Sequence, residues 1–286
     1  MTMTVEREIS PWAVAERALV LVGAVVAILG AAWGSGAFGG TPIEEAAGGV
    51  LASDATLLAP ATPAFGVWSV IYAALAVFAV VQALPTLGSS PRLRAIAWPV
   101  LAAMLLNAAW IYVVQREWLA ASVGVLAAIL IALGIAAARL GRGRPASLLV
   151  AAVSDAPVGL YLGWATVATV ANVTAVVAWW LGSDPEDGMP AAVGVLVATG
   201  FLGIAMVRDL SVSPVLAWTT TATLAWGLAW IGEGRLFGTP EDTVVGWTAI
   251  GAAGAIVLTT AIATVAAQVR ALRWARRQRD RDQQLG

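Results

Sequence analysis

The sequence predicts an all-α integral membrane protein with eight transmembrane helices. Hydrophobic residues make up 60% of the chain and charged residues only 12%, whereas a soluble domain carries about 25% charged residues. A soluble fold of this composition would expose large apolar patches and aggregate. Two further observations are the length of the apolar stretches and the segregation of the charges between loops. Apolar and polar residues do not alternate with a period of two, which argues against a β-barrel.

Eight stretches are long and apolar enough to cross the hydrocarbon core of a bilayer, which takes about 20 residues in a helix. They carry little charge and are rich in Ala, Val, Leu and Gly. The fifth is longer than one straight span needs, so we expect Pro157 to bend it or to mark its effective start. The stretches are 12–34, 64–85, 96–115, 118–139, 148–181, 190–207, 212–232 and 243–268.

The cations indicate how the spans are oriented. All sixteen are Arg, and with the N-terminus inside, all but Arg116 and Arg235 fall at the inner ends of spans or in inner loops and tails. Inner loops of membrane proteins carry an excess of Lys and Arg. This distribution requires strict alternation and therefore an even number of spans. We expect a multi-pass protein of the plasma membrane with both termini in the cytoplasm, and an Arg-rich tail that extends the eighth helix towards anionic lipid.

The outer segment 35–62 is the only long loop. Within it, Thr41-Pro42-Ile43-Glu44 matches a capping box with Pro at the first helical position. This predicts a short surface helix at residues 42–51. Long ordered loops are often lids over binding sites, but a simple connection between two spans explains the segment equally well.

The residues that are missing exclude several kinds of chemistry. The chain has no Cys and no His, which removes disulfides, thiolate metal sites and the usual zinc, copper and haem ligands. Ser-His-Asp hydrolysis is excluded for the same reason. We therefore predict no metal site, no catalytic residue and no obligatory cofactor. Without a Lys-rich run or a nucleic-acid motif, nucleic acid is not an expected partner.

Aromatic and amide side chains form stripes on three of the predicted spans. Residues three or four apart lie on the same face of a helix, and polar groups inside spans tend to face the bundle interior. Converging stripes would form a flat-walled pocket for a large planar apolar ligand. The alternative is that these groups hold the helices together. The predicted ligand-binding residues are Trp68, Tyr72, Asn107, Trp110, Tyr161, Trp164 and Asn172.

Asp155 is a candidate proton site, because it is a carboxylate inside the fifth span, next to Pro157. The alternative is a structural acid that satisfies backbone groups freed by Pro157. No second carboxylate lies at a comparable depth, which argues against catalysis by a pair of carboxyl groups.

Three motifs resemble those of one known family. The segment Thr62-Pro63-Ala64-Phe65-Gly66-Val67-Trp68-Ser69-Val70-Ile71-Tyr72 resembles the second helix of the TspO/MBR family, the tryptophan-rich sensory proteins. Leu106-Asn107-Ala108-Ala109-Trp110 resembles the Asn-x-x-Trp motif of its third helix. Tyr161-Leu162-Gly163-Trp164, continued to Ala168 and Asn172, resembles its fifth-helix motif. The resemblance covers about residues 12–182 and suggests a long form with three extra transmembrane helices.

The resemblance implies a domain organisation and a function. Residues 1–182 would form a TspO/MBR-like five-helix bundle, residues 183–269 three additional spans, and residues 270–286 an Arg-rich cytoplasmic tail. Members of the family bind porphyrins, haem and, in mitochondria, cholesterol, in a pocket closed by the loop between the first two helices. The resemblance assigns the seven residues above to that pocket. A porphyrin or haem could bind there by stacking and hydrogen bonds, without a protein ligand to iron.

We therefore expect a membrane ligand-binding sensor or translocator for a porphyrin or another planar hydrophobic molecule. One alternative is an eight-helix secondary transporter of a small molecule that uses Asp155. A second alternative is a light- or oxygen-dependent porphyrin-degrading enzyme, although an enzyme is not the preferred interpretation. The expected partners are the lipid membrane and a small hydrophobic ligand. A homodimer is also a candidate, since Gly246, Gly251 and Gly254 allow close packing within or between chains.

Overall fold

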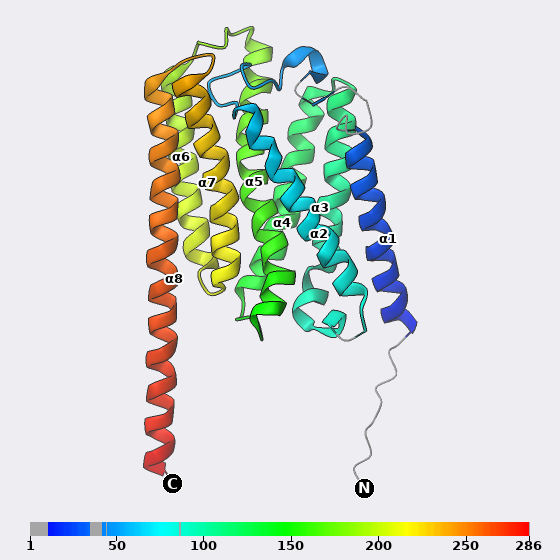
Figure 1. The fold of residues 1–286 in the computed structure, drawn as a ribbon, viewed down its shortest axis with the longest axis vertical. Coiled ribbons are helices and arrows are strands. Elements are labelled where there is room, and N and C mark those ends of the chain that lie inside the picture. Colours follow the sequence, from blue (N-terminus) through cyan, green and yellow to red (C-terminus); the bar gives the residue numbers. More distant parts are fainter. Residues whose placement is uncertain (1–10, 35–41, 44, 86, 286) are drawn as a thin grey trace.

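The computed structural model describes residues 11–34, 42–43, 45–85 and 87–285. These residues form eight long helices and three short 3-10 turns, without a strand. Each long helix coincides with one of the predicted stretches, which confirms the all-α fold class. The helices are α1 (Pro11–Gly34), α2 (Val67–Ala83), α3 (Pro91–Gln115), α4 (Leu119–Gly141), α5 (Leu148–Leu181), α6 (Met189–Leu210), α7 (Pro214–Phe237) and α8 (Thr243–Leu285) (Figure 1).

Seven of the described helices are long and apolar enough to cross a membrane, and α7 is the exception. Its 24 residues would span about 36 Å at 1.5 Å per residue, so its length is sufficient. Its composition falls short because Thr, Trp and Gly residues recur among its apolar residues. Figure 1 shows α7 running alongside α6 and α8. The multi-pass membrane protein is confirmed, while the crossing by α7 stays a prediction.

The first five helices form a closed ring. Contacts connect α1 to α2, α2 to α5, α5 to α4, α4 to α3 and α3 back to α1. One apolar core runs through this ring and includes Phe78, Ile96, Leu133 and Val158. The ring therefore has an interior onto which α2, α3, α4 and α5 each present a face.

Helix α5 continues through Pro157 instead of starting there. It begins at Leu148, where the Oγ of Ser147 accepts a hydrogen bond from the backbone N–H of Val150 at 3.2 Å. It ends at Leu181 and is followed by Gly182, whose φ of 62° lies in the left-handed region favoured by glycine at helix ends. Because the helix is 34 residues long, its faces can serve both the ring and the helices that follow.

The three C-terminal helices pack together and onto the ring through α5 and α7. The backbones of α5 and α7 approach closely at Gly159 and Gly163 of α5. A Cβ built at Gly163 would lie 2.2 Å from the carbonyl oxygen of Thr220, so only glycine fits there. The apolar core of the ring continues across this contact to Leu216 and Ala217 on α7. Packing is thus continuous beyond residue 182, and the predicted domain division there stays a prediction.

The small residues of α8 fall into two groups. A Cβ at Gly246 would lie 2.7 Å from Leu236, so this glycine serves packing within the chain. At Gly251 and Gly254 a Cβ would meet nothing within 4 Å. The homodimer stays a prediction.

Helix α8 has 43 residues and extends straight past the ends of the other helices (Figure 1). At 1.5 Å per residue it is about 65 Å long, roughly twice the thickness of the hydrocarbon core. Its final part carries the exposed Arg270, Arg273 and Arg277. The predicted extension of the eighth helix is therefore present.

The predicted surface helix at residues 42–51 is wrong. The described part of this segment contains only a 3-10 turn, Ala46–Gly49. Ala47 and Gly48 have φ values of 52° and 68°, and an α-helix cannot continue through the left-handed region. Thr41 and Glu44 of the proposed capping box lie outside the described residues.

Candidate ligand-binding site

Three adjoining cavities occupy the interior of the five-helix ring. The outer one, of about 50 Å³, lies beneath the α1–α2 connector, and the middle one, of about 30 Å³, lies between α2, α3, α4 and α5. The outer and middle cavities share Trp110 and Trp164, while the middle one shares Asn107 and Tyr161 with an inner one of about 10 Å³. The seven predicted residues, Trp68, Tyr72, Asn107, Trp110, Tyr161, Trp164 and Asn172, all line these cavities.

Aromatic rings form much of the cavity wall. Trp68 and Tyr72, four residues apart on α2, stack with their ring centroids 5.2 Å apart and an interplanar angle of 21°. The indole of Trp164 on α5 is nearly perpendicular to that of Trp68, at a centroid distance of 6.2 Å. Phe65, just before α2, meets Trp164 edge-on at 5.7 Å. The i, i+4 spacing places Trp68 and Tyr72 on one face of α2, and the α2–α5 contact brings Trp164 against this face.

Two hydrogen bonds cross the interior of the ring and join α3 to α2 and to α5. The side-chain amide of Asn107 donates to the hydroxyl of Tyr72 at 2.8 Å. The hydroxyl of Tyr161 donates to the carbonyl oxygen of Ala103 at 3.0 Å. These polar groups line the cavities and also hold the helices together. The two interpretations of the stripes, as a ligand pocket and as contacts between helices, are therefore compatible.

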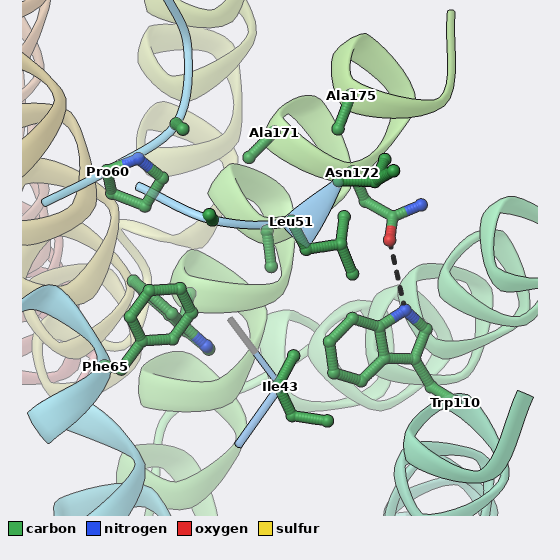
Figure 2. A pocket seen from close by; sticks show the side chains of 13 residues that line it. Ile43, Leu51, Pro60, Phe65, Trp110, Ala171, Asn172 and Ala175 are labelled. Carbon is green, nitrogen blue, oxygen red and sulfur yellow. Dashed lines mark hydrogen bonds between the residues drawn. The ribbon is translucent and has the colours of Figure 1, made fainter. Parts of the chain in front are cut away.

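A second network joins α3, α4 and α5 at the outer cavity. The indole N–H of Trp110 donates to the side-chain oxygen of Asn172 at 3.3 Å (Figure 2). The amide nitrogen of Asn172 donates to the hydroxyl of Ser122 at 2.9 Å. Ser122 is fully buried and was not among the predicted residues. Its only signal in the sequence is a small polar residue inside an apolar span.

The indole N–H of Trp164 has no hydrogen-bond acceptor among the described residues. The side chain is 1% exposed and lines both the outer and the middle cavity. A buried donor without a partner costs free energy, so such groups are rare in folded proteins. Trp164 thus provides an unused donor in the wall of an apolar cavity.

A sequence model of the family described as TSPO-like protein matches residues 18–262. The chain belongs to the TSPO-like protein family. The match extends from α1 into α8 and therefore past residue 182, where the resemblance in the sequence motifs ended. No curated protein and no solved structure matches the chain.

The connector between α1 and α2 closes the outer cavity of this TSPO-like protein. Figure 2 shows Ile43, Leu51 and Pro60 of the connector facing Trp110 and Phe65 across the cavity. None of the thirteen residues that line this cavity is charged. Ligand sites are typically about 300–1,000 Å³, so the connector and the side chains beneath it must move before a large ligand can enter.

Asp155 of the TSPO-like protein lies in a separate site at the other end of the bundle. Its fully buried carboxylate accepts hydrogen bonds from Arg92, through Nε at 2.8 Å and Nη2 at 2.6 Å. The hydroxyls of Ser154 and Ser213 also donate to it. Its partners are therefore side chains of α3, α5 and the start of α7, and not backbone groups freed by Pro157. The proton role of Asp155 stays a prediction.

Proposed function

We propose that this TSPO-like protein binds a planar hydrophobic molecule, such as a porphyrin, inside the five-helix ring and acts as a sensor or translocator of it. The observation that carries the proposal is the buried indole N–H of Trp164, which has no acceptor in the described structure. An oxygen or nitrogen acceptor on a bound ligand would satisfy this donor. The uncharged lining and the aromatic rings favour a ligand with an apolar, flat body.

The other polar groups support a ligand with few acceptors. Asn107, Trp110, Tyr161 and Asn172 already hydrogen-bond within the protein. A ligand that needed many hydrogen bonds would have to break these pairs, and each break costs free energy. A tetrapyrrole ring presents mostly apolar faces, so stacking on Trp68 and Trp164 would provide most of the contact, and any carboxylates would point towards the outer mouth.

Trp164→Phe is expected to weaken protoporphyrin binding about tenfold, because a lost hydrogen bond together with a small cavity costs about 1–2 kcal/mol. The measurement is a titration of purified protein in detergent, followed by the shift of the porphyrin absorption band. The matched control is Trp247→Phe, because this tryptophan of α8 is 62% exposed and lines none of the three cavities.

Saturable binding by the wild type and by Trp247→Phe, with a weaker Trp164→Phe, would support the proposal. Equal dissociation constants for all three proteins, or absorption that does not saturate, would contradict it. The eight-helix transporter and the porphyrin-degrading enzyme remain as alternatives, and they predict uptake into proteoliposomes and loss of the pigment under light or oxygen, respectively.

We also propose that the protein lies in the plasma membrane with both termini in the cytoplasm. The start of α1 and the end of α8 are at the same end of the bundle (Figure 1). This end carries Arg92 in the first turn of α3 and Arg142 and Arg144 in the α4–α5 loop. The opposite end carries acids such as Asp184 and Glu186, as expected when the Arg-rich end faces the cytoplasm.

The lack of Cys in the chain allows a direct test of this orientation. Ser183 and Ala146 are exposed in loops at opposite ends of the bundle. In intact spheroplasts, Ser183→Cys is expected to react with a membrane-impermeant maleimide, whereas Ala146→Cys is expected to react only after lysis. The reverse pattern would invert the topology, and labelling of both in intact cells would contradict the single crossing by α5 between the two positions.

A further inference from the structure

We propose that α7 holds half of the cavity's lid in place, so that the cavity opens only through the other half. The connector contains a front segment, residues 45–52, and a rear segment, residues 53–64. Our proposal is that the rear segment is a fixed wall fastened to α7 and that the front segment alone moves when a ligand enters. The ligand in this proposal is the one of the proposed function, whereas the division of the connector can be measured without it.

Arg235 fastens the rear segment to α7. It lies near the end of this helix and is 1% exposed. Its guanidinium donates from Nη1 to the carbonyl oxygen of Thr56 at 3.2 Å and from Nη2 to that of Ser53 at 2.9 Å. Nη2 also donates to the carbonyl oxygen of Thr239 at 3.1 Å. Its Nε has no acceptor among the described residues. A buried cation is costly unless it is hydrogen-bonded, so Arg235 depends on these three carbonyl groups, and they are held in place by its two Nη atoms.

Three further contacts repeat this attachment along α7. The backbone N–H of Ala61 donates to the carbonyl oxygen of Trp230 at 3.1 Å. The indole N–H of Trp226 donates to the carbonyl oxygen of Ala64 at 2.9 Å. Leu57 and Leu58 are buried in the core cluster formed mainly by α6, α7 and α8. Moving the rear segment would break these bonds and expose both leucines.

The front segment has different contacts. Its described main-chain hydrogen bonds are local, such as those from Val50 to Ala47 and from Ala52 to Gly49. Val50, Leu51 and Ala52 are half-buried and line the outer cavity. In the described part of the chain, this segment packs against α3 through the short 3-10 turn and has no main-chain hydrogen bond to another helix. It can therefore move away from the cavity while breaking few bonds, which is the property of a segment with low local stability.

This arrangement gives the three C-terminal helices a role at the binding site. Arg235, Trp226 and Trp230 touch the connector and do not line the three cavities. They are therefore positioning residues that act through the lid. The ligand should pass between the front segment and the ring, above Trp110 and Asn172.

A disulfide between the rear segment and α7 tests this directly. A Cβ built at Gly234 would lie 3.5 Å from the Cβ of Ala61, a separation that suits a disulfide. In the Ala61→Cys/Gly234→Cys variant of the full chain, oxidation is expected to leave the association rate of protoporphyrin within about twofold of the reduced form. A fall of about tenfold or more on oxidation, reversed by reduction, would overturn the proposal.

Hydrogen exchange measured by mass spectrometry on the ligand-free protein provides the second test. Peptides from residues 45–52 are expected to exchange at least about tenfold faster than those from 56–64. Arg235→Met should raise exchange in 53–64, whereas Thr221→Val, which removes a buried hydrogen bond to Thr260 on α8, should leave this segment unchanged. If Arg235→Met does not fold, Trp226→Phe takes its place, because it removes the bond to Ala64 and keeps an aromatic ring beside Trp230.

Equal exchange of the two segments, or equal effects of Arg235→Met and Thr221→Val on residues 53–64, would overturn the proposal. These measurements do not depend on a ligand. If the wild type fails to bind protoporphyrin, the proposed function fails, and the exchange data still decide whether α7 fastens half of the connector.

Discussion

Asp155→Ala is expected to lower the free energy of unfolding by about 3–5 kcal/mol, the usual cost of removing one partner of a buried ion pair. The carboxylate of Asp155 is fully buried and the side chain of Arg92 is 12% exposed. Without Asp155, the guanidinium of Arg92 keeps its bond to the carbonyl oxygen of Gly143 at 2.8 Å but loses its counter-charge. The hydroxyl of Ser213, at the start of α7, also loses its acceptor.

The measurement is thermal unfolding of the purified protein in detergent. Glu186→Ala, which removes an exposed acid from the α5–α6 loop, is the control and should unfold at the wild-type temperature. The double variant Arg92→Met/Asp155→Leu should recover much of the lost stability, because replacing both ions with apolar groups removes the unpaired charge. A destabilisation of the double variant equal to the sum of both single variants would contradict this account.

The same double variant bears on the proton role of Asp155. If the ion pair is structural, a stable Arg92→Met/Asp155→Leu protein should bind protoporphyrin like the wild type. A secondary transporter that used Asp155 for protons would fold in this variant and lose coupled uptake. The geometry favours the structural interpretation, because four side-chain donors from three residues already occupy the carboxylate.

Hydrophobicity and length were sufficient to predict the helices. Each of the eight stretches became one helix, because a segment in lipid must satisfy its backbone groups internally. The connector could not be predicted in this way. Its capping motif indicated an α-helix, but Ala47 adopts a φ of 52°, and neither the motif nor the intrinsic preference of alanine predicts a left-handed residue.

The sequence predicted which residues of the candidate site share a face of the same helix. The i, i+3 and i, i+4 spacings correctly placed Trp68 with Tyr72 and predicted the face that carries Tyr161 and Trp164. The spacings do not say which helices are neighbours. The partner of Asn172 is Ser122, 50 residues away, and its importance depends on the contact between α4 and α5.

The roles of two arginines were hidden for the same reason. Arg92 and Arg235 entered the sequence argument only as charges to be counted on either side of the membrane. In the structure, Arg92 neutralises a buried carboxylate 63 residues away, and Arg235 holds carbonyl groups 179 and 182 residues away. Charge counting reports the side of the membrane, whereas burial and partners depend on the tertiary fold.

Gly163→Ala is expected to be among the most destabilising single-methyl additions in the chain. The new Cβ would lie 2.2 Å from the carbonyl oxygen of Thr220 and 2.9 Å from the backbone nitrogen of Leu224. Both are backbone atoms of α7, so they cannot move aside as a flexible side chain would. We expect α5 and α7 to separate, at a cost of about 3 kcal/mol or more in the free energy of unfolding.

Gly134→Ala is the matched control, because a Cβ at this position of α4 meets nothing within 4 Å. It should leave the unfolding temperature unchanged or raise it slightly, since alanine favours the helix over glycine. Equal unfolding temperatures for both variants would contradict the close α5–α7 contact.

The α5–α7 contact also positions the lid, because α7 fastens the rear segment of the connector. Gly163→Ala should therefore speed exchange of residues 53–64 as well, although Gly163 lines none of the three cavities.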